Sequence, residues 1–135
     1  MRVRKLPLQG PYRVYATCDA RGTPELLAFF EGLDANLQKD RTRMLALLEQ
    51  VAEAGPPRNT VLSHKLDGNI WEFIRGRLRV CWFFDEGKVV ICTHGFIKKT
   101  QKTPRAELRK ANDRRKSYME ARVAGTLTIE DEGNE

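Results

Sequence analysis

The stretch IWEFIRGRLRVCWFFDEGKVVICTHGF, residues 70–96, decides the fold of this chain. Its apolar residues recur with a period of two, and it is rich in β-branched and aromatic side chains, which is typical of strands. We predict three strands in this region, at Ile70–Arg75, Arg77–Phe84 and Lys88–Phe96. The last two are joined by Asp85-Glu86-Gly87, a hairpin turn signal.

The register of this hairpin follows from its turn. If Glu86 and Gly87 are the two central residues, Cys81 faces Cys92 and Arg79 faces His94. One face, the predicted core, then holds Leu78, Val80, Trp82, Phe84, Val89 and Ile91. The other face holds Arg77, Arg79, His94, Cys81 and Phe83. A three-residue loop would shift the register by one and break the pairing of Arg79 with His94.

Outside the hairpin the sequence predicts another strand and three helices. A first strand is expected at Pro11–Cys18, and Thr23-Pro24-Glu25 opens a helix with Thr23 as its N-cap. A second helix is expected at 35–54, and a third after Thr103-Pro104. The third helix is predicted to turn Leu108, Ala111 and Tyr118 inward and Arg105, Arg109 and Lys116 toward water. We therefore expect an α+β fold, a small antiparallel sheet with an N-terminal helical hairpin and a C-terminal helix.

Length and composition indicate one folded domain. The chain has 135 residues, 41% of them hydrophobic and 31% charged. We predict a single domain over residues 1–122 and an acidic tail over residues 123–135 that could fray or shield the basic surface. No apolar run is long enough for a membrane helix or a signal peptide, so we expect a cytoplasmic protein. Cys18, Cys81 and Cys92 form no CxxC pair, and we predict buried thiols instead of disulfides or a zinc site.

The positive charge is concentrated in one segment. The chain carries 24 Lys and Arg against 18 Asp and Glu, a net charge of +6. Residues 98–122 carry ten basic and three acidic residues, a net charge of +7, whereas residues 123–135 carry four acidic residues and no basic ones. Such a concentration favours a polyanionic partner. The alternative is a solvated basic helix face.

Several groups suited to phosphodiester chemistry converge on one edge of the predicted sheet. In the register above Arg79 and His94 lie side by side, and the last strand runs into the cationic loop THGFIKKTQKTP at Thr93–Pro104. Cleavage of a phosphodiester requires cations for the growing negative charge and a group that transfers protons near neutral pH. The alternative is that Arg79 pairs with Glu72 or Asp85 as ordinary sheet surface and that His94 is a satisfied, half-buried histidine.

Residues 65–111 resemble the phage-derived toxin branch of the RelE/ParE/HigB superfamily of type II toxin–antitoxin systems. The most specific piece is HGFIKKTQKTP at His94–Pro104, followed by a helix that carries Ala111. A weaker pattern near the N-terminus, a strand, ARG and a helix, extends the resemblance to about residues 12–120. The resemblance implies a compact RelE-like fold, in which two helices pack against a twisted antiparallel sheet.

The resemblance also implies an activity like that of the RNA-cleaving branch, whose members cut mRNA on the ribosome. They use no metal or cofactor, and a ribose 2′-hydroxyl attacks the adjacent phosphate. Matched to this sequence, the family pattern gives phosphate binding to Arg79 and stabilisation of the transition state to Lys98 and Lys99. His94 is the strand residue suited to proton transfer, and Glu72 serves as a base or, in our preferred interpretation, orients Arg79. Further RNA contacts are expected from Arg75, Arg77, Lys102, Arg105 and Arg109.

The expected partners are mRNA, the ribosome and a cognate antitoxin, which in such systems is a small helix-turn-helix protein. A second hypothesis is a toxin without catalysis, which inhibits a target such as gyrase or the ribosome, or an RNA-binding module. It arises because the strand Ile70–Arg75 lacks the additional Lys, His or Tyr groups that RNA-cleaving relatives often carry. A third hypothesis is a charged interaction domain without a nucleic acid partner.

Overall fold

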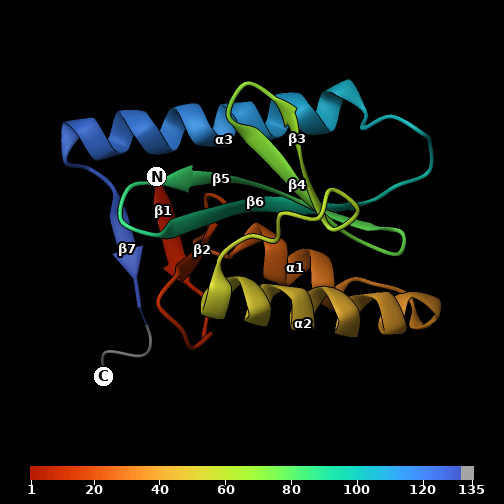
Figure 1. Ribbon diagram of the computed structural model, residues 1–135. Coiled ribbons are helices and arrows are strands. Elements are labelled where there is room, and N and C mark those ends of the chain that lie inside the picture. The colour runs from red at the N-terminus through yellow and green to blue at the C-terminus, as the bar shows by residue number, and fades with distance from the viewer. Residues whose placement is uncertain (132–135) are drawn as a thin grey trace.

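The computed structural model describes residues 1–131, in which one seven-stranded sheet separates two layers of helix (Figure 1). Helices α1 and α2 cover one face of the sheet, and α3 crosses the other face (Figure 1). The predicted α+β class is confirmed. In chain order the elements are β1 (Arg2–Lys5), β2 (Arg13–Thr17), α1 (Glu25–Glu31), the 3-10 helix η1 (Ala35–Leu37), α2 (Gln38–Ala54), β3 (Ser63–Asp67), β4 (Ile70–Arg75), β5 (Leu78–Asp85), β6 (Val89–Ile97), α3 (Arg105–Ala124) and β7 (Thr128–Glu130).

The sheet is mixed, with strand order β3-β4-β5-β6-β2-β1-β7. Strand β2 pairs parallel with β6, and β1 pairs parallel with β7, whereas the other neighbours are antiparallel. The prediction of a purely antiparallel sheet is therefore wrong. The parallel pairing of β2 with β6 follows from the path of the chain. From β2 the chain passes through α1 and α2 to β3 at the far edge of the sheet, and the antiparallel strands β4, β5 and β6 then bring it back beside β2.

The predicted N-terminal helical hairpin is also wrong. Strands β1 and β2 precede the helices, and the seven-residue α1 is followed by η1 before α2 begins. Helix α1 starts at Glu25 with Pro24 in the N-cap position, and no side chain caps it. Thr23 is thus not the N-cap, and its backbone N–H donates instead to Asp19 Oδ1 at 3.0 Å. Leu26 and Phe30, four residues apart, are the buried residues of α1 and face the sheet.

The β5–β6 hairpin has a different register from the predicted one. Asp85 pairs with Val89, so the turn contains three residues, 86–88, and the register shifts by one. Trp82 therefore lies opposite Cys92, and the predicted pairing of Cys81 with Cys92 is wrong. Two turn residues, Gly87 at φ 78° and Lys88 at φ 61°, have positive φ, which the alternation of the flanking strands did not predict.

A bulge in β6 adds a second shift. Past the pair Trp82–Cys92, Thr93 is the extra residue, so that Cys81 lies opposite His94. Arg79 then lies opposite Phe96, and its predicted pairing with His94 is wrong. Because the two shifts together amount to two residues, Arg79 and His94 still share a face of the sheet, as predicted.

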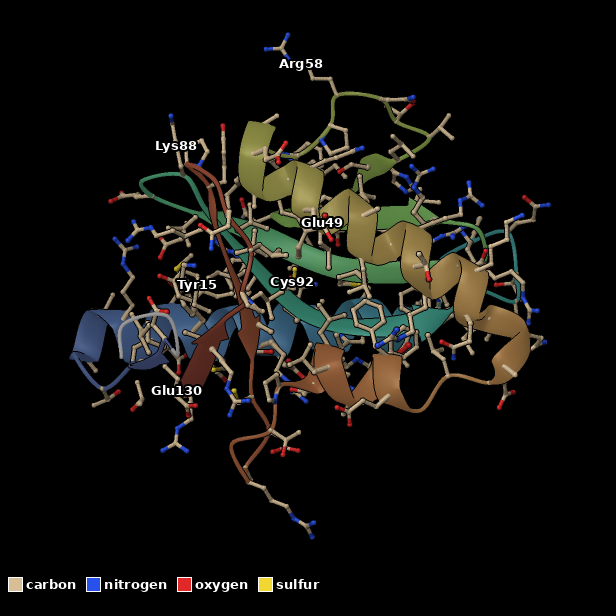
Figure 2. The ribbon with its side chains drawn as sticks, turned by 90° about the horizontal axis from the view of Figure 1, so that it is seen from below. Tyr15, Glu49, Arg58, Lys88, Cys92 and Glu130 are labelled. Atoms are coloured by element: carbon tan, nitrogen blue, oxygen red, sulfur yellow. The ribbon has the colours of Figure 1, made fainter. Side chains whose placement is uncertain are left out.

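Both faces of the sheet are buried, which explains the nearly continuous apolar runs in β5 and β6. Figure 2 views the molecule from the side of α1 and α2 and includes Cys92, a member of the core on that side. That core contains Leu78, Val80, Trp82, Val90 and Cys92 with side chains of both helices. The second core, under α3, contains Val3, Tyr15, Ile70, Cys81, Phe83, Val89, Ile91, Phe96, Ala111 and Tyr118.

The one-residue shift explains the wrong face assignments. Val89 and Ile91, predicted to share a core with Leu78, belong to the opposite core with Cys81. Phe84, also predicted as core, is 45% exposed near the end of β5. Cys18, Cys81 and Cys92 are buried, as predicted.

Helix α3 begins at Arg105, next to the predicted Thr103-Pro104 start, but Pro104 is in the N-cap position. Ala111 and Tyr118 are buried and Leu108 packs against the second core. The predicted outward positions are confirmed, since Arg105, Arg109 and Lys116 are exposed. Within residues 1–131 no helix combines the length and the apolar character that crossing a membrane requires.

Part of the predicted acidic tail belongs to the sheet. Strand β7 pairs with β1, and Glu130 lies 3.1 Å from both the Arg2 Nε and the Arg4 Nη2 atoms. These contacts neutralise one carboxylate of the acidic segment against two arginines at the N-terminus. Residues 132–135 of the predicted tail lie outside the described residues.

Candidate functional site

Two cation-bearing segments meet at the β4–β5 turn. A hollow of about 460 Å³ is lined by Arg77 and Arg79 from the turn and β5, by Lys98 and Lys99 after β6, and by Gly76, Thr100 and Gln101. We call it the cationic hollow. The Lys98 backbone N–H donates to the Arg77 carbonyl oxygen at 2.8 Å, which holds the two segments together. Four of the cations named from the sequence are thus gathered on one surface.

Helix α2 supports the turn that presents Arg77. Gly76 adopts φ 55°, a left-handed conformation that favours glycine. The Arg77 backbone N–H donates to Asp40 Oδ2 at 3.0 Å, from the first turn of α2. A Cβ at Gly76 would collide with the Asp40 carboxylate. The turn therefore requires glycine both for its φ angle and for the close approach of Asp40.

Arg79 is held in place from two sides. Its Nη1 donates to the carbonyl oxygens of Gly76 at 2.8 Å and Leu78 at 2.9 Å, and its Nε lies 3.6 Å from Glu72 Oε1. Burial lowers the pKa of Arg79 and the Glu72 carboxylate opposes this effect. A guanidinium remains charged at neutral pH in either case. With its side chain 13% exposed, Arg79 offers a positioned cation at the inner wall of the cationic hollow.

Glu72 lies behind Arg79 and is fully buried. Its Oε2 accepts a hydrogen bond from Thr103 Oγ1 at 2.8 Å, and its Oε1 lies 3.6 Å from His64 Nε2 as well as from Arg79. Buried carboxylates need such partners, because an isolated buried charge is strongly unfavourable. The contacts favour orientation of Arg79 as the role of Glu72.

His94 does not line the cationic hollow. It is 2% exposed on the face of the sheet that α3 covers. Its Nδ1 lies 3.0 Å from Thr93 Oγ1, and its Nε2 lies 3.6 Å from Glu107 Oε1, too far for a hydrogen bond. Burial and the ammonium group of Lys110 lower the pKa of His94 to about 4. The imidazole is therefore neutral at pH 7, despite its nearby carboxylate.

Helix α3 is attached over His94 at its middle. Glu25 of α1 accepts a hydrogen bond from Arg114 Nε at 2.6 Å, and Lys110 Nζ lies 3.3 Å from the same carboxylate. Burial raises the pKa of Glu25, but the hydrogen bond and charge of Arg114 outweigh it and lower the pKa overall. These ion pairs bind α3 to α1 across the edge of the second core.

The C-terminal end of α3 is attached to the β5–β6 turn. The Tyr118 hydroxyl donates to Asp85 Oδ2, and Arg122 Nη1 donates to Asp85 Oδ1 at 2.8 Å. The Tyr118 ring also packs edge-on against Phe83, with centroids 5.3 Å apart. Tyr118 is thus a core residue, and with the Glu25 pairs it keeps the helix closed over the sheet.

The remaining RNA contacts predicted from the sequence lie outside the cationic hollow. Arg75 is half-buried at the end of β4. Lys102 is exposed in the loop before α3, and Arg105 and Arg109 are exposed in its first two turns. Sequence reasoning missed His64 and Asp40, which lie far along the chain from the residues they support. The sequence offers one signal for His64, since the alternation typical of strands begins there.

The site contains cations and buried polar groups but no set of metal ligands. Within residues 1–131 no three His, Cys, Asp or Glu side chains are placed to hold a metal ion together. The arrangement can bind successive phosphates, because one guanidinium is fixed by backbone carbonyls and two ammonium groups lie beside it. Neither Glu72 nor His94 lines the cationic hollow while α3 covers the sheet. In this arrangement neither side chain can act there as a general acid or base.

The model of a known protein family matches the part of the chain that contains the cationic hollow. The model of a family described as phage-derived protein Gp49-like (DUF891) matches residues 28–116, from within α1 into α3. The match includes every residue of the cationic hollow. A comparison with curated proteins gives no match. Because the family match covers well over half of the chain, the protein belongs to the phage-derived Gp49-like family, which is part of the RelE/HigB toxin superfamily.

Proposed function

We propose that the protein is the toxin of a type II toxin–antitoxin system and acts as an mRNA interferase, an endoribonuclease that cuts ribosome-bound message. The observation that carries the proposal is the cationic hollow, in which Arg77, Arg79, Lys98 and Lys99 converge. Membership of a toxin superfamily supports the biological role. The net charge of +6 further favours a polyanionic target.

In the proposed reaction the ribose 2′-oxygen attacks the adjacent phosphorus, and the bond from phosphorus to the 5′-oxygen breaks. The products are a 2′,3′-cyclic phosphate and a 5′-hydroxyl end, with the 2′-hydroxyl proton removed and another delivered to the leaving oxygen. Arg79, Lys98 and Lys99 stabilise the negative charge that develops on the phosphoryl oxygens. Glu72 keeps Arg79 in position through their 3.6 Å contact.

Proton transfer by His94 would require a change of conformation. In the closed arrangement the imidazole is 2% exposed beneath α3. A role in catalysis therefore depends on displacement of α3 when the RNA or the ribosome binds, a step of the kind that completes many active sites. Otherwise a ribosomal group or a lysine of the cationic hollow must move the proton.

The second candidate is a toxin that blocks its target without cleavage, with gyrase or the ribosome as the target. It is favoured by the burial of both Glu72 and His94. In either case we propose that a small helix-turn-helix antitoxin neutralises the protein, through an acidic or amphipathic segment that covers the cationic hollow. Co-expression with the neighbouring open reading frame tests this partner, since growth should be restored.

Induced expression in cells tests the proposed function. Wild-type protein should arrest growth and translation, and the Lys98→Ala/Lys99→Ala double variant should relieve the arrest at the same protein level. Continued arrest by the double variant would contradict the assignment of the cationic hollow. Arrest in cells whose messages stay intact would favour the non-catalytic toxin.

A further inference from the structure

A second hollow, rich in aromatic side chains, lies on the face of the sheet opposite to α3. Its volume is about 500 Å³, and it is bounded by the loop after α2, by β3 and by the start of β4 and end of β5. Its apolar wall consists of Pro56, Pro57, Trp71, Trp82 and Phe84. We call it the aromatic hollow.

The aromatic rings are arranged as a stack with one accessible end. Phe73 and Trp82 stack with centroids 4.8 Å apart, and Trp82 and Trp71 stack with centroids 5.4 Å apart. Phe73 and Trp82 are fully buried, whereas Trp71 is only partly buried. Phe84, 45% exposed, lies edge-on to both tryptophans. A planar ligand would find both a flat ring and a perpendicular ring at the surface.

Two polar atoms of the lining residues have no partner within the described chain. Ser63 Oγ and Trp82 Nε1 are buried and make no hydrogen bond. Buried donors are nearly always satisfied, because leaving one unpaired is costly. A ligand of this hollow should therefore carry hydrogen-bond acceptors besides an apolar surface. Nucleobases have this combination, unlike purely apolar side chains.

The charge around the aromatic hollow has one sign. Arg58 and Lys65 are the charged residues of its lining, which includes no acidic residue. Arg58 projects away from the body of the molecule (Figure 2). Cations at the rim and aromatic rings at the base are the combination that binds single-stranded nucleic acid.

The aromatic hollow and the cationic hollow lie at opposite ends of the β4–β5 pair, and Glu72 of β4 lies between them along the strand. His64 lines the aromatic hollow and Arg79 lines the cationic one, and each places a nitrogen 3.6 Å from the same Glu72 Oε1 atom. Because a strand rises about 3.3 Å per residue, an extended RNA of several nucleotides that runs along β4 can contact both surfaces. The shared carboxylate thus links β3 to β5 between the two surfaces.

We propose that the aromatic hollow binds an unpaired nucleobase of the RNA strand whose phosphates contact the cationic hollow. The inference rests on the proposed function and adds a base-binding subsite to it. The base packs against the accessible side of Trp71 and the perpendicular ring of Phe84, and Arg58 and Lys65 contact the flanking phosphates. The subsite favours RNA that is single-stranded at this position.

The test uses a 2′-O-methyl hexaribonucleotide, which binds but lacks the attacking hydroxyl. The chain has two tryptophans and both line the aromatic hollow, so intrinsic fluorescence reports directly on its occupancy. The hexanucleotide should quench the wild-type fluorescence, and Trp71→Leu should weaken its binding about tenfold, while Trp71→Phe retains most of the affinity. A hexamer with abasic sites throughout should bind wild type and Trp71→Leu equally.

Phe84→Leu provides a second variant, at a side chain that is 45% exposed, and should weaken binding of the hexanucleotide several-fold. Val123→Leu, at a 90% exposed position on α3, is the control and should change nothing. Unchanged hexanucleotide affinity in both Trp71→Leu and Phe84→Leu would overturn the inference. Equal quenching by the abasic hexamer would overturn it as well. So would an acidic, apolar peptide that occupies the aromatic hollow without displacing the RNA.

The result is independent of cleavage. If messages stay intact in arrested cells but the hexanucleotide binds as described, the nuclease proposal fails and the base-binding subsite stands. If messages are cut but binding is indifferent to Trp71 and Phe84, only the subsite fails.

Discussion

The backbone N–H of Lys98 donates a hydrogen bond of 2.8 Å to the carbonyl oxygen of Arg77. This single bond continues the β5–β6 ladder one step beyond the last strand pair, Leu78–Ile97. The loop that follows β6 is thereby held against the β4–β5 turn. Two cationic segments about twenty residues apart in the chain thus form one surface.

Removal of the two lysines should reduce the salt dependence of RNA binding. Each ammonium that contacts a phosphate releases counterions, so Lys98→Ala/Lys99→Ala should flatten the slope of log affinity against log salt by about 1.4. The measurement is titration of the 2′-O-methyl hexanucleotide at several salt concentrations. Lys116→Ala, which removes an exposed lysine of α3, is the control and should leave the slope unchanged. Equal slopes in all three proteins would rule out phosphate contacts by Lys98 and Lys99.

Substitution of Gly76 should disrupt the turn that presents Arg77. Gly68 is a matched control, because its φ of 52° is close to the 55° of Gly76 but a Cβ there would meet no atom within 4 Å. Gly68→Ala should cost about 1–2 kcal/mol of folding free energy from the φ angle alone. Gly76→Ala should cost roughly 1–3 kcal/mol more, because its Cβ collides with Asp40. Urea denaturation of both variants measures the difference, and equal losses would show that Asp40 does not constrain the turn.

The ion pairs between α1 and α3 should contribute to stability. Glu25→Gln leaves Arg114 and Lys110 without their shared carboxylate, so the free energy of unfolding should fall by about 1–3 kcal/mol. Glu120→Gln removes an exposed i,i+4 pair with Lys116 on the same helix and should have almost no effect. Thermal and urea unfolding compare the two variants. A loss no larger than that of Glu120→Gln would mean that α3 is held by its apolar contacts alone.

Burial of His94 should make stability depend on pH. Burial lowers the pKa of His94 to about 4 in the folded protein, from 6.5 for an unperturbed histidine. Between these values the unfolded chain binds a proton that the folded protein does not, so stability falls as pH falls, by up to about 1.4 kcal/mol per pH unit. His94→Gln should show a flatter profile over this range, since Glu25, Glu107, Lys110 and Arg114 around the site are unchanged. Parallel profiles from urea denaturation would contradict the burial of a neutral imidazole.

The hairpin shows how far the sequence predicts this fold. Period-two alternation is sufficient to locate β4, β5 and β6, and it places Arg79 and His94 on one face. Their neighbours depend on a three-residue turn and on the bulge at Thr93, which no local pattern marks. Strands β1 and β7, of four and three residues, are too short for alternation to be detected.

The site was predictable to a similar extent. The sequence is enough to place Arg79, Lys98 and Lys99 at one edge of the sheet, where they line one hollow, whereas the roles proposed for them come from the resemblance to the toxin family. The burial of His94 and Glu72 depends on the packing of α3. The sequence shows that Ala111 and Tyr118 of this helix point inward, but it does not show which face of the sheet they pack against. His64 and Asp40 are brought to the site by tertiary contacts only.

The most direct measurement is the mapping of RNA 5′ ends after induction, by a method that distinguishes 5′-hydroxyl from 5′-phosphate termini. Attack by the 2′-hydroxyl predicts new 5′-hydroxyl ends within coding regions in cells that express the wild type, and their loss in Lys98→Ala/Lys99→Ala. Intact messages in arrested cells, or new ends that carry a 5′-phosphate, would contradict the proposed cleavage.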